Sequence, residues 1–94
     1  MHELISSAEA NRLARLPNYQ FISLDQIQVR DTHHLDRKKI QKIKRHLESG
    51  GMCSPIEIRS ADTNRYLIAG DGRHRYTAHK ELGLPTIFCR IRIQ

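Results

Sequence analysis

The sequence is poor in cysteine, aromatic residues and long apolar runs, and each shortage excludes a class of protein. Its two cysteines lie far apart and form no CxxC or Cys/His metal-binding spacing, so neither a disulfide framework nor a zinc site is predicted. With three Tyr, two Phe and no Trp, a broad base-stacking surface for single-stranded nucleic acid is poorly supported. No apolar run approaches the roughly 20 residues of a membrane span, and no secretory signal pattern opens the chain. We therefore expect a cytoplasmic protein that does not enter a membrane.

Acidic residues are also scarce. Ten Asp and Glu stand against 16 Lys and Arg, which gives a net charge of +6, and the pI is about 9.8. A small basic domain is suited to polyanions such as nucleic acid, nucleotides or anionic lipid, although a soluble protein can also be basic without such a partner. The 94 residues are enough for one domain with one modest core.

The apolar periodicity predicts an α+β domain with a small mixed sheet of about four strands, two main helices and an N-terminal helix. Residues 1–20 are expected to form an N-terminal arm with a short helix, and residues 21–94 the domain itself. Asp36 is the expected N-cap of the first main helix, which ends at Gly50. The predicted order is helix, strand, helix, strand, strand, helix, strand, at residues 6–16, 21–24, 36–50, 55–59, 66–69, 73–82 and 86–93.

The turn from Gly70 to Arg75 joins an apolar strand to a helix, which is the geometry of an anion site. The first N–H groups of a helix have no partner within it, and the helix dipole adds positive potential there. Gly70 and Gly72 allow the backbone to approach a phosphate closely. Arg73, His74 and Arg75 bring cationic or hydrogen-bonding side chains onto the first helical turn. These six residues are therefore the predicted phosphate site, unless the cations are simply solvated.

Asp71 is a carboxylate in the middle of this turn, and three roles are open to it. It can hold Mg²⁺, act as a general base, or merely cap the following helix. Asp71 is accordingly both the candidate catalytic residue and the candidate metal ligand.

Cationic residues also lie along the first main helix. Lys39, Lys42 and His46 share the spacing i, i+3, i+7 and form a stripe beside the apolar stripe of that helix. At the edge of the core, these three side chains are expected to point into a cleft shared with the turn, although a solvated basic face would show the same pattern. Cations that face farther out suit the phosphate backbone of DNA: Arg37, Lys38 and Arg45.

Four segments, at 35–47, 54–58, 69–78 and 82–87, together resemble the ParB/sulfiredoxin superfamily over about residues 21–93. The most specific is Gly72 to Ala78, which reads Gly-Arg-His-Arg-Tyr-Thr-Ala. It is similar to the Gly-Cys-His-Arg-Tyr-x-Ala of sulfiredoxins and the Gly-Glu-Arg-Arg-x-x-Ala of partition proteins. With Asp71 it also resembles the Asp-Gly-His-His-Arg of ParB-like free serine kinases. The resemblance implies a compact ParB/sulfiredoxin-like fold whose turn binds nucleotide phosphates.

Carried over by position, His74 and Arg75 match the phosphate-binding pair of sulfiredoxins, and Lys39 matches a lysine that reaches the nucleotide. Lys42 and His46 stand where sulfiredoxins have Ser and Thr. Arg73 stands where sulfiredoxins have their catalytic cysteine, which argues against thiol-based sulfinic acid reduction.

Three functions follow from these features. The first is a ParB-like module of a plasmid, phage or chromosome-maintenance system that binds ATP or CTP, with Mg²⁺, and associates with DNA without sequence preference. The second is a nuclease, NTPase or small phosphotransferase that uses Asp71. The third is a ligand-free interaction module that docks a protein partner through its N-terminal arm. The predicted nucleotide-binding residues are Lys39, Lys42, Gly70, Asp71, Gly72, Arg73, His74 and Arg75.

Overall fold

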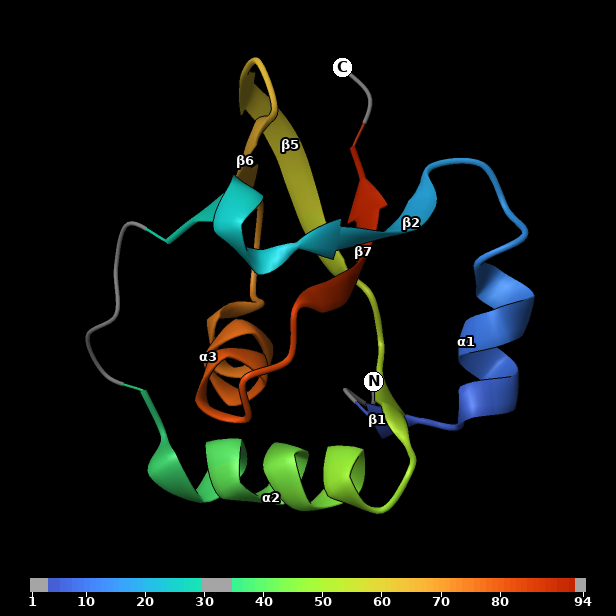
Figure 1. Ribbon diagram of the computed structural model, residues 1–94, viewed down its shortest axis with the longest axis vertical. Helices are drawn as coiled ribbons and strands as arrows, with labels where there is room; N and C mark the ends of the chain where they lie inside the picture. The colour runs from blue at the N-terminus through green and yellow to red at the C-terminus, as the bar shows by residue number, and fades with distance from the viewer. Residues whose placement is uncertain (1–3, 30–34, 93–94) are drawn as a thin grey trace.

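The computed structural model describes residues 4–29 and 35–92, and alternating apolar residues build a five-stranded mixed sheet within it (Figure 1). The strand order is β2-β7-β5-β6-β3. The β2–β7 and β5–β6 pairs are antiparallel, whereas β5–β7 and β3–β6 are parallel. The strands are β2 (Tyr19–Ser23), β3 (Ile27–Gln28), β5 (Ile56–Asp62), β6 (Arg65–Ile68) and β7 (Thr86–Ile91).

Two helices are stacked beneath this sheet. In Figure 1, α3 (Arg73–Glu81) lies between the sheet and α2 (Arg37–Glu48). One buried cluster of the core is built mostly from strand residues such as Ile56 and Ile58, with Tyr76 of α3 packed against it. A second joins α2 to α3 and includes Ile40 and Ala78. The helix α3 is therefore covered from two sides, and this position buries three of its polar side chains, His74, Arg75 and His79.

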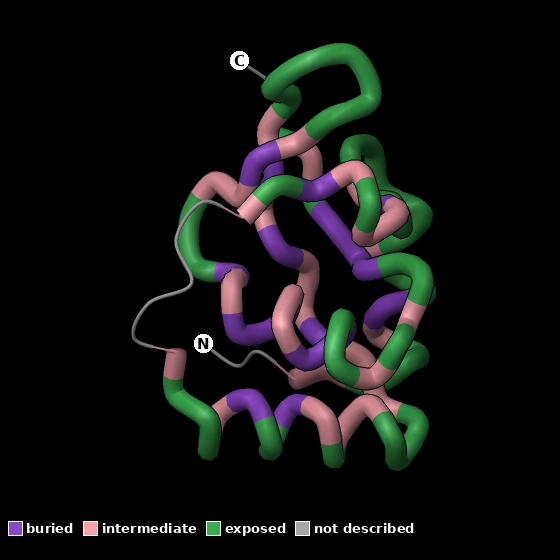
Figure 2. The backbone as a smooth tube through the Cα atoms, turned by 60° about the vertical axis from the view of Figure 1, so that its left-hand side comes forward, coloured by how far each residue is buried: buried purple, intermediate pink, exposed green. Residues whose placement is uncertain are grey.

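The amphipathic pattern of α2 places one face inward. Ile40 and Ile43 are buried, and Figure 2 shows buried and exposed stretches alternating along this helix. The helix begins as predicted: the Asp36 side chain accepts hydrogen bonds from the N–H groups of Lys38 (3.0 Å) and Lys39 (3.4 Å). It ends at Glu48, with Ser49 as its C-cap.

Residues 4–13 of the predicted N-terminal arm lie against the rest of the chain through a small second sheet, whereas Tyr19 and Gln20 of that arm already belong to β2 of the main sheet. In the small sheet β1 (Leu4–Ile5) pairs antiparallel with β4 (Met52–Cys53), and the following α1 (Ser7–Leu13) buries Ala10. The sequence places His46 in a cleft, but its Nε2 lies 2.8 Å from the carbonyl oxygen of Ile5. Its ring fills the space above Gly51, where a Cβ would come within 2.2 Å of Nε2. His46 therefore fastens the arm to α2.

The predicted fold class is confirmed, and the differences concern short elements. The sheet has five strands rather than about four, and the β1–β4 pair adds a second sheet. Each of β1, β3 and β4 has two residues, too few for an apolar alternation to be visible in sequence. The end of the last predicted strand, at Ile93, lies outside the described residues. Within residues 4–29 and 35–92, no helix is long and apolar enough to cross a membrane.

Candidate functional site

The turn between β6 and α3 is shaped by two glycines with different roles. Gly70 has a φ of +133°, a conformation that side chains with a Cβ disfavour. Gly72 lies against β5, and a Cβ there would stand 2.9 Å from Cγ2 of Ile56. Gly72 is also the N-cap of α3, and within the described chain no side chain caps it by a hydrogen bond. The suggestion that Asp71 caps the helix is therefore wrong.

A cavity of about 860 Å³ opens beside this turn, between α2, the segment that joins β4 to β5, and the sheet. This volume lies within the usual range for small-molecule sites. One wall is apolar and comes from Leu4, Ile43 and Pro55. The polar lining carries both signs of charge: Lys39, Lys42, Glu57, Asp71, Arg75, Arg90 and Arg92.

Arg75 borders the cavity and also connects two of the segments that line it. Its side chain is buried, with a relative exposure of 6%. Nη1 donates to the backbone oxygen (3.1 Å) and hydroxyl (3.0 Å) of Ser54 and to the Pro55 carbonyl (3.2 Å), and Nη2 donates to the Asp71 carbonyl. The guanidinium thus holds the start of β5 to the Gly70–Arg75 turn.

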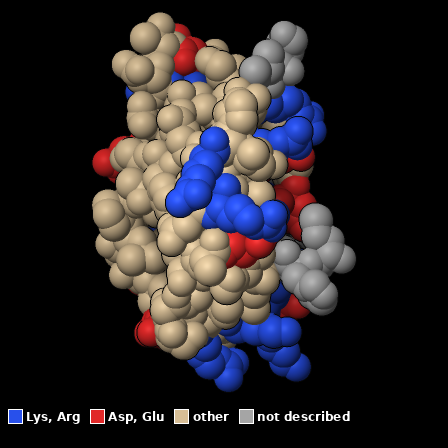
Figure 3. Space-filling view, turned by 90° about the vertical axis from the view of Figure 1, so that its right-hand side faces the viewer, with Lys and Arg blue, Asp and Glu red and all other residues tan. Residues whose placement is uncertain are grey.

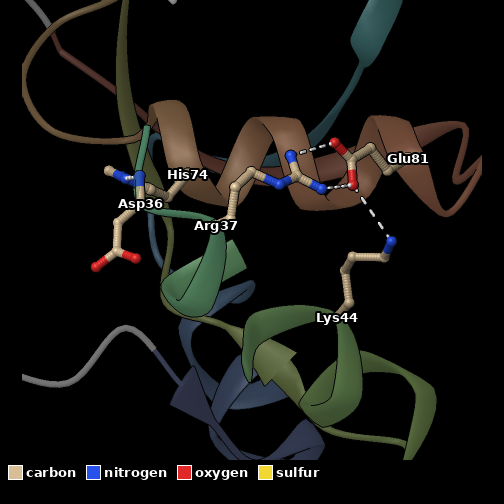
Figure 4. Close-up of polar contacts among 5 residues, drawn as sticks. All are labelled: Asp36, Arg37, Lys44, His74 and Glu81. Atoms are coloured by element: carbon tan, nitrogen blue, oxygen red, sulfur yellow. Dashed lines mark hydrogen bonds and ion pairs between the residues drawn. The ribbon is translucent and has the colours of Figure 1, made fainter. Parts of the chain in front are cut away.

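His74 joins the starts of the two helices. Its Nε2 accepts a hydrogen bond of 2.9 Å from the backbone N–H of Asp36, and Figure 4 shows the two groups in contact. Because Nε2 is the acceptor, the ring proton lies on Nδ1 in this arrangement. Nδ1 is buried and has no hydrogen-bond partner among the residues that the structure describes. In this geometry His74 is a neutral link between α3 and α2.

Arg37 and Glu81 make a second link between these helices. The Arg37 guanidinium donates two hydrogen bonds to the Glu81 carboxylate, at 2.7 and 2.9 Å, and Lys44 Nζ adds a third at 3.2 Å (Figure 4). The hydrogen bond from Arg37 lowers the pKa of Glu81 to about 2. Arg37, predicted to contact DNA, therefore stands in an ion pair across the helices, while Lys38 and Arg45 are exposed on α2.

Arg73 borders a different space from Arg75. It lines a smaller cavity of about 180 Å³ together with Arg59 and Leu67. Of the predicted nucleotide-binding residues, the structure brings five to the large cavity: Lys39, Lys42, Gly70, Asp71 and Arg75. The other three, Gly72, Arg73 and His74, do not line it.

Arg90 and Arg92 line the cavity together with Glu57, and the sequence reasoning for this site missed both arginines. Arg90 Nη1 lies 3.2 Å from Oε1 of Glu57, and Arg92 Nη2 lies 2.5 Å from Oε2. The alternation of residues 86–93 places both arginines on one face of a strand. The sequence does not show what this face contacts. The parallel pairing of β5 with β7 sets Glu57 opposite Arg90 and so brings the two arginines to the cavity beside the Gly70–Arg75 turn.

Asp71 lines the cavity and is exposed, so its carboxylate is the group of this turn that would hold a magnesium ion. Mg²⁺ is commonly held by one or two carboxylates together with substrate phosphates, so it does not need a cage built by the protein. Among the described residues, no group of three or more His, Cys, Asp and Glu side chains could hold a metal ion. Any Mg²⁺ would therefore depend on the phosphates of the ligand.

Neither cysteine borders the cavity. Cys53 and Cys89 are buried in different clusters of the core. Burial raises the pKa of the Cys89 thiol to about 12, which disfavours the reactive thiolate.

Comparisons with known proteins agree with this fold. The family of the ParB N-terminal domain matches residues 5–94. The chloroplastic/mitochondrial sulfiredoxin of Arabidopsis thaliana is 38% identical over 61 residues, which are 65% of this chain and 47% of that protein. This chain thus spans about half the length of that curated relative. The crystal structure of the Arabidopsis sulfiredoxin superposes with a TM-score of 0.72 at 31% identity, covering 83% of this chain and 88% of the other.

Two further solved structures are similar. A free serine kinase in complex with AMP has a TM-score of 0.65 and 27% identity, over 80% of this chain and 31% of the kinase. The truncated partitioning protein ParB of Caulobacter crescentus, complexed with CTP-γ-S, has a TM-score of 0.64 at 20% identity. That match covers 81% of this chain and 44% of ParB, and at this identity it shows the shared fold alone.

Proposed function

This chain belongs to the ParB N-terminal domain family, and we propose that it is a nucleotide-binding domain. The observation that carries the proposal is the large cavity, whose lining combines apolar side chains with cations and with Gly70 and Asp71 of the turn before α3. A nucleotide needs these same elements, because its base and ribose require contact surface while its phosphates require N–H groups and positive charge. The kinase structure with AMP, at 27% identity, supports the proposal.

In the proposed complex the base lies against Leu4, Ile43 and Pro55. The phosphates lie at Gly70 and Asp71, where Lys42 reaches them from α2. Arg75 holds the floor of this site in place rather than serving mainly as a phosphate ligand. ATP and CTP are the candidate nucleotides, and Mg²⁺ binds between their phosphates and Asp71.

A thermal-shift and calorimetric screen of ATP, ADP, CTP and GTP, with and without Mg²⁺, tests this function. A ligand that binds the folded state alone raises the melting temperature, by an amount that grows with its concentration over Kd. Inorganic tripolyphosphate is the matched control, because it carries the phosphates without the base. Tighter binding of a nucleotide than of tripolyphosphate is expected. If no nucleotide produces heat or a thermal shift, the proposal is wrong and the ligand-free interaction module replaces it.

Association with DNA is the second part of the proposed function. Figure 3 shows Lys and Arg side chains in the middle of this face, at its upper right and along its lower edge, and the lower edge is the height at which α2 lies in Figure 1. Lys38 and Arg45 are exposed on that helix and suit phosphate contacts without base recognition. Binding to random duplex DNA should weaken steeply with salt. The charge reversals Lys38→Glu and Arg45→Glu should abolish it, whereas Arg65→Glu, at the far end of β6, should not.

Catalysis by Asp71 is the second candidate function. The observation that favours it is that this carboxylate does not cap α3 and is exposed at the cavity edge. As a base or Mg²⁺ ligand it would support hydrolysis or transfer of a phosphoryl group. The test measures Mg²⁺-dependent turnover of ATP, CTP and DNA by the wild type and by Asp71→Asn. Turnover that survives the substitution would contradict this role.

A further inference from the structure

The lining of the cavity also contains a pair of arginines held by one carboxylate. Glu57 on β5 receives Arg90 on one oxygen (3.2 Å) and Arg92 on the other (2.5 Å). The backbone oxygen of Glu57 accepts from the N–H of Ala69 at 2.8 Å, which ties this strand to the residue before Gly70. The arginine pair is therefore built onto the same turn as the proposed phosphate site.

This arrangement has the donors of an anion site. Two guanidinium groups that converge on two oxygens of one anion can accept a phosphate group equally well, because Arg binds carboxylate and phosphate by the same hydrogen-bond geometry. The side chains of Arg90 and Arg92 are 53% and 55% exposed, and that of Glu57 is 35% exposed. Ion pairs with this much water contact are weak, so a more highly charged anion can displace the Glu57 carboxylate.

We propose that Arg90 and Arg92 form a second phosphate subsite, which binds the terminal phosphate of a nucleoside triphosphate in place of Glu57. This proposal rests on the proposed nucleotide function and names its substrate class. The apolar wall, the Gly70–Asp71 turn and the arginine pair line one continuous cavity, so one extended ligand can contact all three. A monophosphate bound at the turn would not reach the arginine pair, and both arginines would stay paired with Glu57.

The subsite makes the domain selective for triphosphates. Both arginines add affinity for a ligand that reaches them, and Glu57 opposes the same ligand by competing for the arginines and by repelling its charge. Replacing the arginines should therefore weaken triphosphates specifically, and Glu57→Gln should strengthen them. Neither change should alter the binding of the monophosphate.

Calorimetric titration of nucleoside tri-, di- and monophosphates, together with inorganic phosphate, tests the subsite. The proteins are the wild type, Arg90→Ala/Arg92→Ala, Glu57→Gln and the control Arg59→Ala. Arg59 lies on the same strand as Glu57 but borders the smaller cavity. The double variant should bind the triphosphate about tenfold more weakly or worse, a loss in keeping with charge-assisted hydrogen bonds. Its affinity for the monophosphate should stay within about twofold of the wild type, as should every affinity of Arg59→Ala.

Melting curves show whether each variant folds, and Arg90→Lys/Arg92→Lys provides a version that keeps the charge without the guanidinium fork. Equal losses for all three nucleotides would overturn the subsite, because they would reflect general charge. If the arginine variants lose affinity for inorganic phosphate alone, the two arginines bind the free phosphate ion, and this result would also overturn the subsite. If the wild type binds tri- and monophosphates equally well, the subsite fails while the proposed function stands. If it binds no nucleotide, the proposed function itself fails.

Discussion

The cavity has a buried frame and an exposed rim, and the two differ in what their charged residues do. In the frame, at the start of α3, Arg75 and His74 have relative exposures of 6% and 9% and hold backbone groups of neighbouring segments. On the rim, Lys42 and Arg90 are exposed side chains that border the cavity. The motif that is most recognisable in sequence thus builds the frame, while much of the charge available to a ligand comes from outside it. Substitutions in the frame should change stability, and substitutions on the rim should change affinity.

Arg75→Ala should have the largest effect. It removes the donors to the Ser54, Pro55 and Asp71 carbonyls and leaves these acceptors partly buried without a replacement. We expect a loss of roughly 3 kcal/mol or more in the free energy of unfolding, from several unmade hydrogen bonds and the lost packing of the side chain. Urea denaturation followed by circular dichroism measures it.

Arg73→Ala is the matched control for Arg75→Ala. It removes the same type of side chain from a position that lies two residues earlier in the helix and is less buried. Its loss of stability should be smaller. If Arg75→Ala unfolds at the same urea concentration as the wild type but binds nucleotide far more weakly, Arg75 belongs to the rim and the comparison fails.

The turn from β6 to α3, which borders the cavity at Gly70 and Asp71, could be predicted from the sequence, because an apolar strand followed by glycines and a helix is a local pattern. The directions of the side chains on α3 could not. This helix is covered by the sheet on one side and by α2 on another, so polar residues on it are buried as well as apolar ones. The resemblance to relatives gives His74 a phosphate-binding role, whereas its contact with Asp36, 38 residues away, depends on how α2 and α3 pack.

Gly72→Ala should have the next largest effect. The new Cβ would lie 2.9 Å from Cγ2 and 3.0 Å from Cβ of Ile56, and the backbone of β5 leaves little room for a shift. We expect a cost of about 1–3 kcal/mol, as for other insertions of a methyl group into packed cores. Chemical denaturation measures this cost.

Ile56→Ala gives the matching test by a double-mutant cycle. Because it removes Cγ2 of Ile56, the atom nearest to the new Cβ, and keeps only the Cβ at 3.0 Å, Gly72→Ala should cost less in the Ile56→Ala background than in the wild type. Strictly additive effects would mean that the glycine is needed for a reason other than the space beside Ile56.

Two lysines of α2 test the difference between frame and rim on a single helix. Lys42 borders the cavity, whereas Lys44 donates to Glu81 and links α2 to α3. Lys42→Ala should weaken nucleotide binding about fivefold, a typical loss for one exposed charge near a phosphate, and should leave the melting temperature unchanged. Lys44→Ala should lower the melting temperature slightly and leave affinity unchanged. The reverse result would show that the helix is rotated relative to this description.

The rim was harder to predict than the turn for a reason of topology. Lys39 and Lys42 were found because the spacing along one helix shows which residues share a face. Arg90 and Arg92 share a strand face in the sequence, but their neighbour Glu57 is more than 30 residues away. Parallel pairing of β5 with β7 leaves no short-range signal, because the connection between them contains β6 and α3.

His79 should make the stability of the frame depend on pH. Its Nδ1 lies 2.6 Å from the Arg75 carbonyl, and burial lowers its pKa below the ordinary value of 6.5. The unfolded chain therefore binds a proton more readily than the folded one. The stabilising contribution is complete above pH 6.5 and falls as the pH drops from there through the folded pKa. Melting temperatures measured between pH 8 and pH 5 should change less steeply with pH for His79→Gln than for the wild type. Equal slopes would mean that His79 is accessible to protons in the folded protein.

The smallest effect is expected from Glu81, at the exposed link between α2 and α3. Its pKa is lowered from 4.5 to about 2, first by the hydrogen bond from Arg37. A lowered carboxyl pKa stabilises the folded state above pH 4.5, and this contribution is lost as the pH falls from 4.5 towards 2. Because the ion pair is exposed, water and salt screen most of it. Glu81→Gln should lower the melting temperature slightly at pH 7 in low salt and much less at pH 2, where most of this contribution is lost. Raising the salt at pH 7 should shrink the difference, and a difference that persists in high salt would show that packing rather than charge holds the two helices here.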